Sequence, residues 1–262
     1  MASLDVIKIY GYGWVGRAMK ELFPDAVIHD PQLGHNNPEK ADVAFVCVPT
    51  PNLEDGSLDT SIVREVVENA PEDFIIIRST VMPGTTRDLM VETGKKIVFQ
   101  PEYLGETANH PLIDQHARPF MILGGAKEDT RKAVELYQKT YNANVRIRQV
   151  DTYTAEVIKL SENRAIAFKV AQCQELYDAC EAARVDYYAV RDAVYGDDPR
   201  FNLWFTFVYP NNRGMTSKCI PKDVLAWSAW AESLGYEPKI TDALLEKNKE
   251  WTSGFSNYKL KG

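Results

Sequence analysis

The sequence lacks a long apolar run, and no stretch of it approaches the roughly 18 residues that a membrane-spanning helix needs. Its first fifteen residues have neither the basic start nor the apolar core of a secretory signal peptide. Cysteine is scarce as well, since the four cysteines among 262 residues show no paired spacing, which argues against a disulfide framework. We therefore expect a cytoplasmic protein that does not bind membranes.

Basic residues are fewer than acidic residues: the sequence has 30 Lys and Arg residues, 37 Asp and Glu residues, and a net charge of −7. This balance argues against binding to nucleic acid, whose backbone selects basic surfaces. The four histidines form no His-Glu-x-x-His motif and no cluster with cysteine, so no metal site is expected. The composition, 45% hydrophobic and 26% charged, is typical of a globular chain that can bury a large core.

The first half of the chain alternates short apolar runs with amphipathic stretches. Expected strands cover residues 6–10, 26–29, 43–48, 74–78, 96–99 and 119–123, and expected helices cover residues 16–23, 62–69 and 129–141. Strands that are apolar almost throughout and are separated by helices indicate a parallel sheet covered on both faces. Residues 1–150 are therefore expected to form an α/β domain of the Rossmann type, with a doubly wound, mainly parallel sheet.

The pattern changes after about residue 150. From residue 152 to 184, apolar residues recur at helical spacing without Gly or Pro, which predicts one helix far longer than average. Further helices are expected at residues 187–195, 221–234 and 240–251, with a long connection over residues 195–215. Residues 151–262 are therefore expected to form a second, all-helical domain built on the long helix.

A glycine motif, Gly11-Tyr-Gly13-Trp-Val-Gly16, follows the first expected strand and opens a helix. In a dinucleotide site the first glycine permits the tight turn, the second lets the backbone approach the pyrophosphate, and the third permits helix–strand contact. Asp30 ends the second expected strand, where a carboxylate accepts hydrogen bonds from the ribose hydroxyls and repels a 2′-phosphate. The motif predicts NAD as the cofactor, and the alternative is a similar sheet that binds no dinucleotide.

Cys219 precedes an expected amphipathic helix with Pro221 at its first position, which places the cysteine just outside the helix N-terminus. The positive end of the helix dipole, with Lys218 and Lys222 nearby, favours the thiolate over the thiol. This environment is typical of a nucleophilic cysteine. The alternative is an inert cysteine near a helix end.

Lys159 and Asn163 lie four residues apart within the long expected helix, so their side chains project from one face. A charged donor beside an amide donor can hold a developing oxyanion. Spacing alone is equally consistent with a solvated lysine and a neutral surface asparagine.

Together these motifs resemble the UDP-glucose/GDP-mannose dehydrogenase family of NAD-dependent nucleotide-sugar dehydrogenases. The similar segments are residues 11–16, 48–51, 55–59, 79–86, 101–106, 156–163, 198–200, 219–223 and 234–238. They occur in the order found in the family and extend over nearly the whole chain.

The resemblance implies that a sugar C6 alcohol is oxidised to the uronate in two hydride transfers to NAD. Cys219 would trap the aldehyde as a thiohemiacetal, which is then oxidised to a thioester and cleaved by water. By position in the family motifs, Lys159 and Asn163 would stabilise the oxyanion. Asp223 would assist the water or proton transfers, and Glu106 would be the general base for thioester hydrolysis.

The resemblance also implies the residues that contact the ligands. Thr80 would position water near the nicotinamide, and Arg200 would help to hold the substrate. The cofactor contacts would be Gly11, Gly13, Trp14, Val15, Gly16, Asp30, Pro49, Thr50, Thr80 and Glu106. The substrate contacts would be Glu102, Tyr103, Leu104, Lys159, Asn163, Arg200 and Gly214.

Two features depart from the family pattern. The family has a glycine-rich Gly-Phe-Gly-Gly-Ser-Cys run before its cysteine, whereas residues 213–219 here read Arg-Gly-Met-Thr-Ser-Lys-Cys. Lys218 therefore adds bulk and charge beside Cys219. The family's third domain, which holds the nucleotide, would begin where this sequence stops. A smaller or different nucleotide-sugar, or a separate chain that supplies the missing domain, are the alternatives that follow.

The long helix has more apolar surface than so small a helical domain can cover, and the corresponding helix lies in the subunit interface of the family, so a homodimer is expected.

Two alternatives to the four-electron enzyme stay open. One is a two-electron β-hydroxyacid dehydrogenase, which also uses a Lys and an Asn four apart, and the other is a catalytically silent NAD-binding subunit. The joint presence of Cys219, Lys159, Asn163, Asp223 and Glu106 favours an enzyme.

Overall fold

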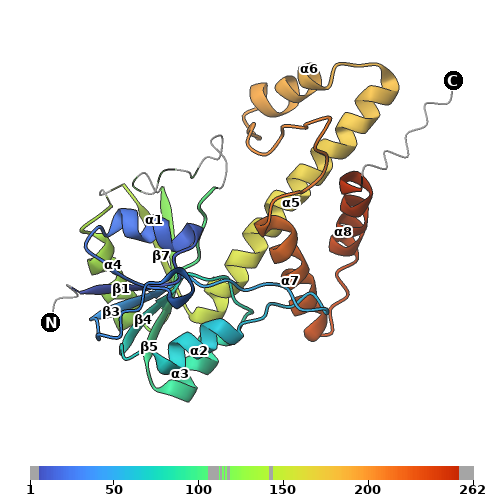
Figure 1. Ribbon diagram of the computed structural model, residues 1–262. Coiled ribbons are helices and arrows are strands. Elements are labelled where there is room, and N and C mark those ends of the chain that lie inside the picture. The colour runs from blue at the N-terminus through green and yellow to red at the C-terminus, as the bar shows by residue number, and fades with distance from the viewer. Residues whose placement is uncertain are drawn as a thin grey trace. The chain divides into compact units, whose positions relative to one another are not determined.

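Seven strands form one sheet within the residues that the computed structural model describes, namely 6–105, 112, 114, 116, 119–141 and 144–253 (Figure 1). The strands lie in the order β2-β1-β3-β4-β5-β6-β7. Their bounds are β1 Ile7–Tyr10, β2 Val27–His29, β3 Val43–Val46, β4 Phe74–Ile77, β5 Lys96–Phe99, β6 Phe120–Gly124 and β7 Arg146–Val150. All neighbouring pairs are parallel except β5 and β6. The expected mainly parallel sheet is confirmed.

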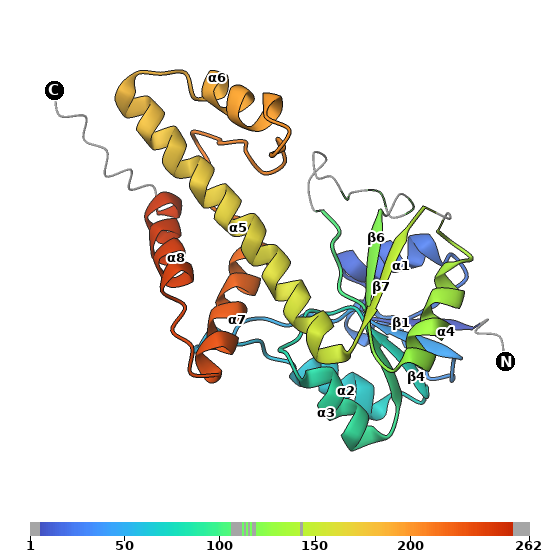
Figure 2. The ribbon, with the colours of Figure 1, turned by 180° about the vertical axis from the view of Figure 1, so that it is seen from behind.

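Helices cover both faces of this sheet (Figure 2). One face packs against α1 (Trp14–Leu22) and α4 (Lys127–Tyr137). The other packs against α2 (Ser61–Asn69), α3 (Thr85–Thr93) and the first turns of α5 (Thr152–Ala183). Successive strand residues point to opposite faces of the sheet and so pack into two hydrophobic cores. Phe45 and Ile76 pack into the core on the α1 and α4 face, whereas Val46 and Ile77 pack into the core on the α2 and α3 face. The sheet is therefore doubly wound.

The chain divides into two compact units, residues 1–53 with 58–159, and residues 54–57 with 160–262. The division falls inside α5, between Lys159 and Leu160. The second unit is helical and also contains α6 (Tyr187–Arg191), α7 (Cys219–Ser233) and α8 (Lys239–Thr252). No helix among the described residues is both long and apolar enough to cross a membrane.

Several elements differ from the sequence expectation. The edge strand β7 was not expected, because Arg146–Val150 is mostly exposed and carries two arginines instead of an apolar run. The helix α3 was not expected either, since its mixed residues Thr85–Thr93 form no clear apolar face. The helix expected over residues 187–195 ends as an α-helix at Arg191 and continues as the π-helix η2 (Asp192–Asp197).

The cysteines separate into two environments. Cys47, Cys173 and Cys180 are buried. Cys219 is exposed. Burial raises the pKa of the Cys47 thiol to about 12, so it stays protonated at neutral pH.

Candidate functional site

The glycine motif forms a tight loop between β1 and α1. Gly11 has a φ of +86°, and a Cβ on it would lie 2.7 Å from the carbonyl oxygen of Cys47. A Cβ on Gly16 would lie 2.0 Å from the carbonyl oxygen of Gly11. A Cβ on Gly13, which precedes the first residue of α1, would meet no protein atom within 4 Å. Two glycines are thus required by backbone contact, and the third leaves open space at a helix N-terminus, which fits a bound pyrophosphate.

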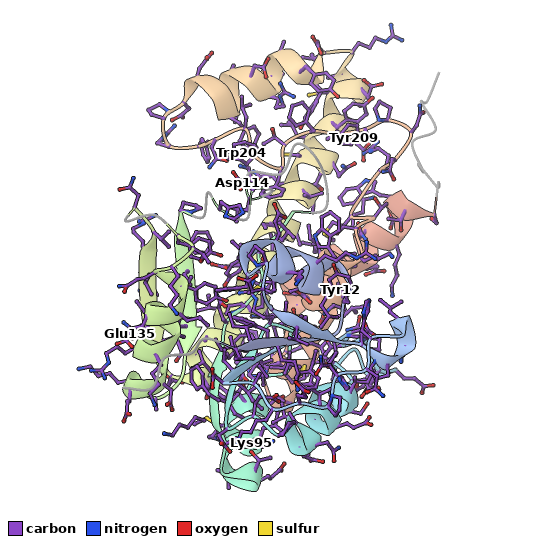
Figure 3. All side chains as sticks on the ribbon, turned by 60° about the vertical axis from the view of Figure 1, so that its left-hand side comes forward. Tyr12, Lys95, Asp114, Glu135, Trp204 and Tyr209 are labelled. Carbon is purple, nitrogen blue, oxygen red and sulfur yellow. The ribbon has the colours of Figure 1, made fainter. Side chains whose placement is uncertain are left out.

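Asp30 lies beside this loop, at the end of β2. Its Oδ2 accepts a hydrogen bond of 2.8 Å from the main-chain N–H of Tyr12, which is labelled in Figure 3. Its Oδ1 accepts a weaker bond of 3.3 Å from the N–H of Leu33, in the 3₁₀-helix η1 (Pro31–Leu33). The carboxylate is therefore held next to the glycine loop, where a ribose would lie if the loop bound a pyrophosphate. Trp14 is 53% exposed and contributes little to the core.

The loops that follow β3 and β4 are joined by hydrogen bonds. The Thr50 hydroxyl donates to the carbonyl of Thr80 at 2.7 Å, and the Ser79 hydroxyl donates to the carbonyl of Val48 at 2.6 Å. Pro49, Thr50 and Thr80 therefore lie at the carboxyl ends of neighbouring parallel strands. The sheet order reverses between β1 and β3, and ligands of open α/β sheets bind at such a reversal.

A buried network follows β5 and reaches α5. Glu102 is 8% exposed and forms an ion pair with Arg78, the residue after β4. The Glu102 Oε1 accepts hydrogen bonds from the main-chain N–H groups of Tyr103 at 2.7 Å and Leu104 at 2.6 Å. Lys159 Nζ donates to the Glu102 carbonyl oxygen at 2.6 Å and lies 5.0 Å from the Tyr103 ring centroid. The structure thus brings together four of the residues predicted for the substrate site.

Glu156, one turn before Lys159, is a second buried carboxyl group. Its oxygens accept hydrogen bonds from the main-chain N–H groups of Gly84 at 2.6 Å and Thr86 at 2.9 Å, at the start of α3. Burial raises the pKa of Glu156 to about 7, although these hydrogen bonds oppose the rise. Sequence reasoning gave no role to Glu156 or to Arg78. The one signal for Arg78 was a charged residue directly after a fully buried strand.

In the second unit, Asn163 and Asp223 are paired. Asn163 Nδ2 donates to Asp223 Oδ2 at 2.6 Å, and these residues are 8% and 1% exposed. Lys222 Nζ lies 2.7 Å from the other oxygen, Oδ1, of Asp223. A buried carboxylate on α7 is therefore fixed to an amide on α5.

Cys219 is the first residue of α7, so the expectation that it lies just outside the helix is wrong: the helix begins two residues earlier than expected. Pro221 is the third residue of α7 and not the first. A proline is tolerated there because the first N–H groups of a helix have no partner within it. The Ser217 hydroxyl oxygen accepts a hydrogen bond of 3.2 Å from the Ile220 N–H and so satisfies one of these N–H groups.

Two other predicted substrate contacts have protein partners in the structure. Arg200 has a mostly exposed side chain that pairs with Asp198 at 2.6 Å. Gly214 has a φ of +77°, and a Cβ on it would lie 2.7 Å from Asn248 Oδ1. Asn248 in turn accepts from the N–H of Met215 at 2.6 Å, so the glycine lets the loop before Cys219 pack on α8.

Glu106 lies outside the described residues, so nothing in the structure bears on its predicted role. Thr80 and Lys159 belong to the first unit, and Asn163, Cys219 and Asp223 belong to the second. Their catalytic roles stay predictions. Among the residues that the structure describes, no group of three or more His, Cys, Asp or Glu side chains is placed to hold a metal ion.

Comparison with known proteins supplies the family. Residues 27–142 match the NAD binding domain of the UDP-glucose/GDP-mannose dehydrogenase family, and residues 153–250 match its central domain. The UDP-glucose 6-dehydrogenase AglM of Haloferax volcanii is 28% identical over 232 residues, which are 79% of this chain and 52% of that protein. The GDP-mannose 6-dehydrogenase of Pseudomonas aeruginosa is 27% identical over 227 residues, 79% of this chain and 51% of that protein. The chain spans about half the length of the curated relatives it matches.

Solved structures show the same fold. A UDP-glucose dehydrogenase from Pyrobaculum islandicum has a TM-score of 0.75 at 23% identity, over 93% of this chain and 68% of that one. The UDP-D-ManNAc dehydrogenase from Pyrococcus horikoshii has a TM-score of 0.76 at 20% identity, over 94% and 68%. The two domain matches follow one another in the family's order, and the glycine loop, which precedes the first match, fits a dinucleotide. The chain belongs to the UDP-glucose/GDP-mannose dehydrogenase family, and its first part is that family's NAD-binding domain.

Proposed function

We propose that this chain oxidises the C6 alcohol of a nucleotide-sugar to the uronate, in the manner of a UDP-glucose 6-dehydrogenase. The observation that carries the proposal lies in the second unit. An exposed cysteine begins α7, and one turn further along the same helix the buried Asp223 is bonded to Asn163. An accessible thiol close to a fixed carboxylate and amide is what covalent capture of an aldehyde requires.

The residues that would hold NAD are those of the glycine loop and of the neighbouring strand ends. The N-terminal N–H groups of α1, beyond Gly13, would bind the pyrophosphate. Asp30 would accept hydrogen bonds from the ribose, and its negative charge would disfavour the 2′-phosphate of NADP. Pro49, Thr50 and Thr80 would border the nicotinamide end. When bound, NAD accepts the hydride that leaves the substrate in each oxidation.

Cys219 takes the central role in the chemistry. The alcohol carbon first loses a hydride and its hydroxyl a proton, which leaves an aldehyde. The Cys219 sulfur adds to the aldehyde carbon, and the oxygen takes a proton to give a thiohemiacetal. Loss of a second hydride and of that proton gives a thioester. Water then attacks the carbonyl carbon, the carbon–sulfur bond breaks, and the carboxylate leaves as the thiol is restored. Glu106 would be the general base that removes a proton from this water.

Lys159 and Asn163 would stabilise the oxyanions of these steps. Each donor is held by a partner of its own, Lys159 by the Glu102 carbonyl and Asn163 by the Asp223 carboxylate. Donors that are already fixed need little reorganisation during the reaction, and each can contribute about 10²–10³ in rate. Asp223 would also assist the transfer of protons.

The proposal includes a homodimer formed through α5. Ala165, Gln172 and Ala179 are exposed on α5 at intervals of seven residues, so they share one face of the helix. Two of the three are small, which permits close approach of a second helix. Light scattering after size exclusion tests this part, with a dimer expected for the wild type and a monomer for Ala179→Glu.

The reaction is tested by following NADH formation with UDP-glucose, GDP-mannose and UDP-ManNAc, the sugars named in its relatives. Two NADH per uronate are expected, with loss of turnover in Cys219→Ala and a Cys219-linked acyl adduct by mass spectrometry. One NADH per substrate and a fully active Cys219→Ala variant would indicate a two-electron β-hydroxyacid dehydrogenase instead. Tight NAD binding with no reduction by any nucleotide-sugar would indicate a silent subunit.

A further inference from the structure

Arg78 is a buried cation that the proposed chemistry does not use. It follows the last residue of β4 and is 4% exposed. Its guanidinium pairs with Glu102 Oε2, and the side chain of Glu102 is 9% exposed. Ion pairs this far from water are costly to form because both charges lose their hydration, which points to a specific role for the pair.

The side-chain carboxylate and the main-chain carbonyl of Glu102 bind different partners. Its carboxylate turns back along the chain, so that Oε1 accepts the N–H groups of Tyr103 and Leu104 while Oε2 faces Arg78. Its main-chain carbonyl accepts the ammonium hydrogen of Lys159 at 2.6 Å. The conformation that the carboxylate imposes on the loop therefore also fixes the oxygen that holds Lys159.

We propose that Arg78 is a positioning residue for Lys159 and acts through Glu102; this inference rests on the proposed function, in which Lys159 stabilises the oxyanion. Without the guanidinium, the Glu102 carboxylate loses the ion pair with Arg78 in a site from which water is nearly excluded. The loop then rearranges to hydrate or protonate the carboxyl group, and the carbonyl that holds Lys159 moves. A donor displaced by about 1 Å lowers the rate by about 10²-fold.

Kinetics of single and double variants test the inference. Arg78→Met is expected to lower kcat about 10²-fold, because the displaced Lys159 donor acts in the reacting step. KM is expected to rise as well, because the rearranged loop carries the predicted substrate contacts Tyr103 and Leu104. Arg78→Lys is expected to recover most of the activity, since Arg78 donates to Glu102 Oε2 through one guanidinium nitrogen, Nη2. In a Lys159→Met background, adding Arg78→Met is expected to change kcat by less than about twofold, because both changes remove the same donor.

Hydrogen exchange of the loop gives a readout that does not depend on turnover. The amides of Tyr103 and Leu104 are expected to exchange at least about tenfold faster in Arg78→Met than in the wild type or in Arg78→Lys. The matched control is Arg64→Met, which removes an arginine from a partly exposed ion pair with Glu92 and is expected to leave both kcat and this exchange unchanged. Thermal melting and NAD affinity confirm that the variants are folded.

An equal loss of kcat from Arg78→Met in the wild-type and Lys159→Met backgrounds would overturn the inference, as would unchanged exchange of the loop amides. A wild-type protein that forms no NADH from any nucleotide-sugar would instead overturn the proposed function. In that case the exchange measurement still decides whether Arg78 holds the loop.

Discussion

Glu156 makes the stability of the first unit depend on pH in an unusual direction. The carboxyl group is fully buried and is held by the N–H groups of Gly84 and Thr86. Its pKa is raised by burial from an ordinary 4.5 to about 7, so the folded state holds this proton more tightly than the unfolded state does. The stabilisation is complete below about pH 4.5 and is lost as the pH rises through about 7.

The change in the free energy of unfolding follows from the two pKa values of Glu156, in the folded and the unfolded state. The difference between about 7 and 4.5, at about 1.4 kcal/mol for each pH unit, amounts to roughly 3 kcal/mol. The perturbation is Glu156→Gln, because glutamine keeps the size and one acceptor oxygen but does not ionise. We expect the free energy of unfolding of the wild type, relative to Glu156→Gln, to fall by roughly 3 kcal/mol between about pH 4.5 and pH 8.

Urea denaturation followed by circular dichroism across this pH range is the assay. Asp151→Asn is the matched control, since hydrogen bonds from Thr154 lower the pKa of this exposed carboxyl group below its ordinary 3.8. A lowered pKa costs stability only as the pH falls through it, so this control is expected to be flat over the range. A wild-type advantage that stays constant, or that grows with pH, would refute the reasoning about Glu156.

Three further predictions concern chemistry, cofactor choice and the core. Cys219→Ala is expected to lower uronate formation by about 10³-fold or more while leaving NAD affinity unchanged by calorimetry. Asp30→Ser is expected to reduce the preference for NAD over NADP by about tenfold or more in binding assays, because a like charge near the 2′-phosphate is removed. Lys8→Met removes the cation that lies 2.9 Å from the buried Glu72 carboxylate and is expected to lower the free energy of unfolding by about 3–5 kcal/mol. Lys40→Met, in an exposed pair, is expected to change it by about 0–1 kcal/mol.

The sheet could be predicted because its strands are short apolar runs that are buried on both faces. The strand β7 was not predicted, because an exposed edge strand needs no apolar run. The start of α7 was misplaced because Pro221 marks the first turn of a helix and not one position within it.

Within the site, the glycine loop and Asp30 were predictable from local spacing. The tight turn after β1 fixes the positions of the glycines, and the end of β2 fixes the position of Asp30. Arg78 and Glu156 were not, because their partners lie far along the chain. Glu102 is 24 residues from Arg78, and Gly84 is 72 residues from Glu156. A buried charge is recognisable only once the fold has brought its partner to it.

One of the four cysteine thiols is exposed to solvent, so the number of thiols that react distinguishes folded from unfolded molecules. Cys47, Cys173 and Cys180 are shielded by packing, whereas Cys219 is open to reagents dissolved in water. Under native conditions, an alkylating dye should therefore mark each folded molecule once, and unfolding should release the remaining three thiols. Labelling stoichiometry would then report both the purity of a preparation and its history of exposure to oxidants.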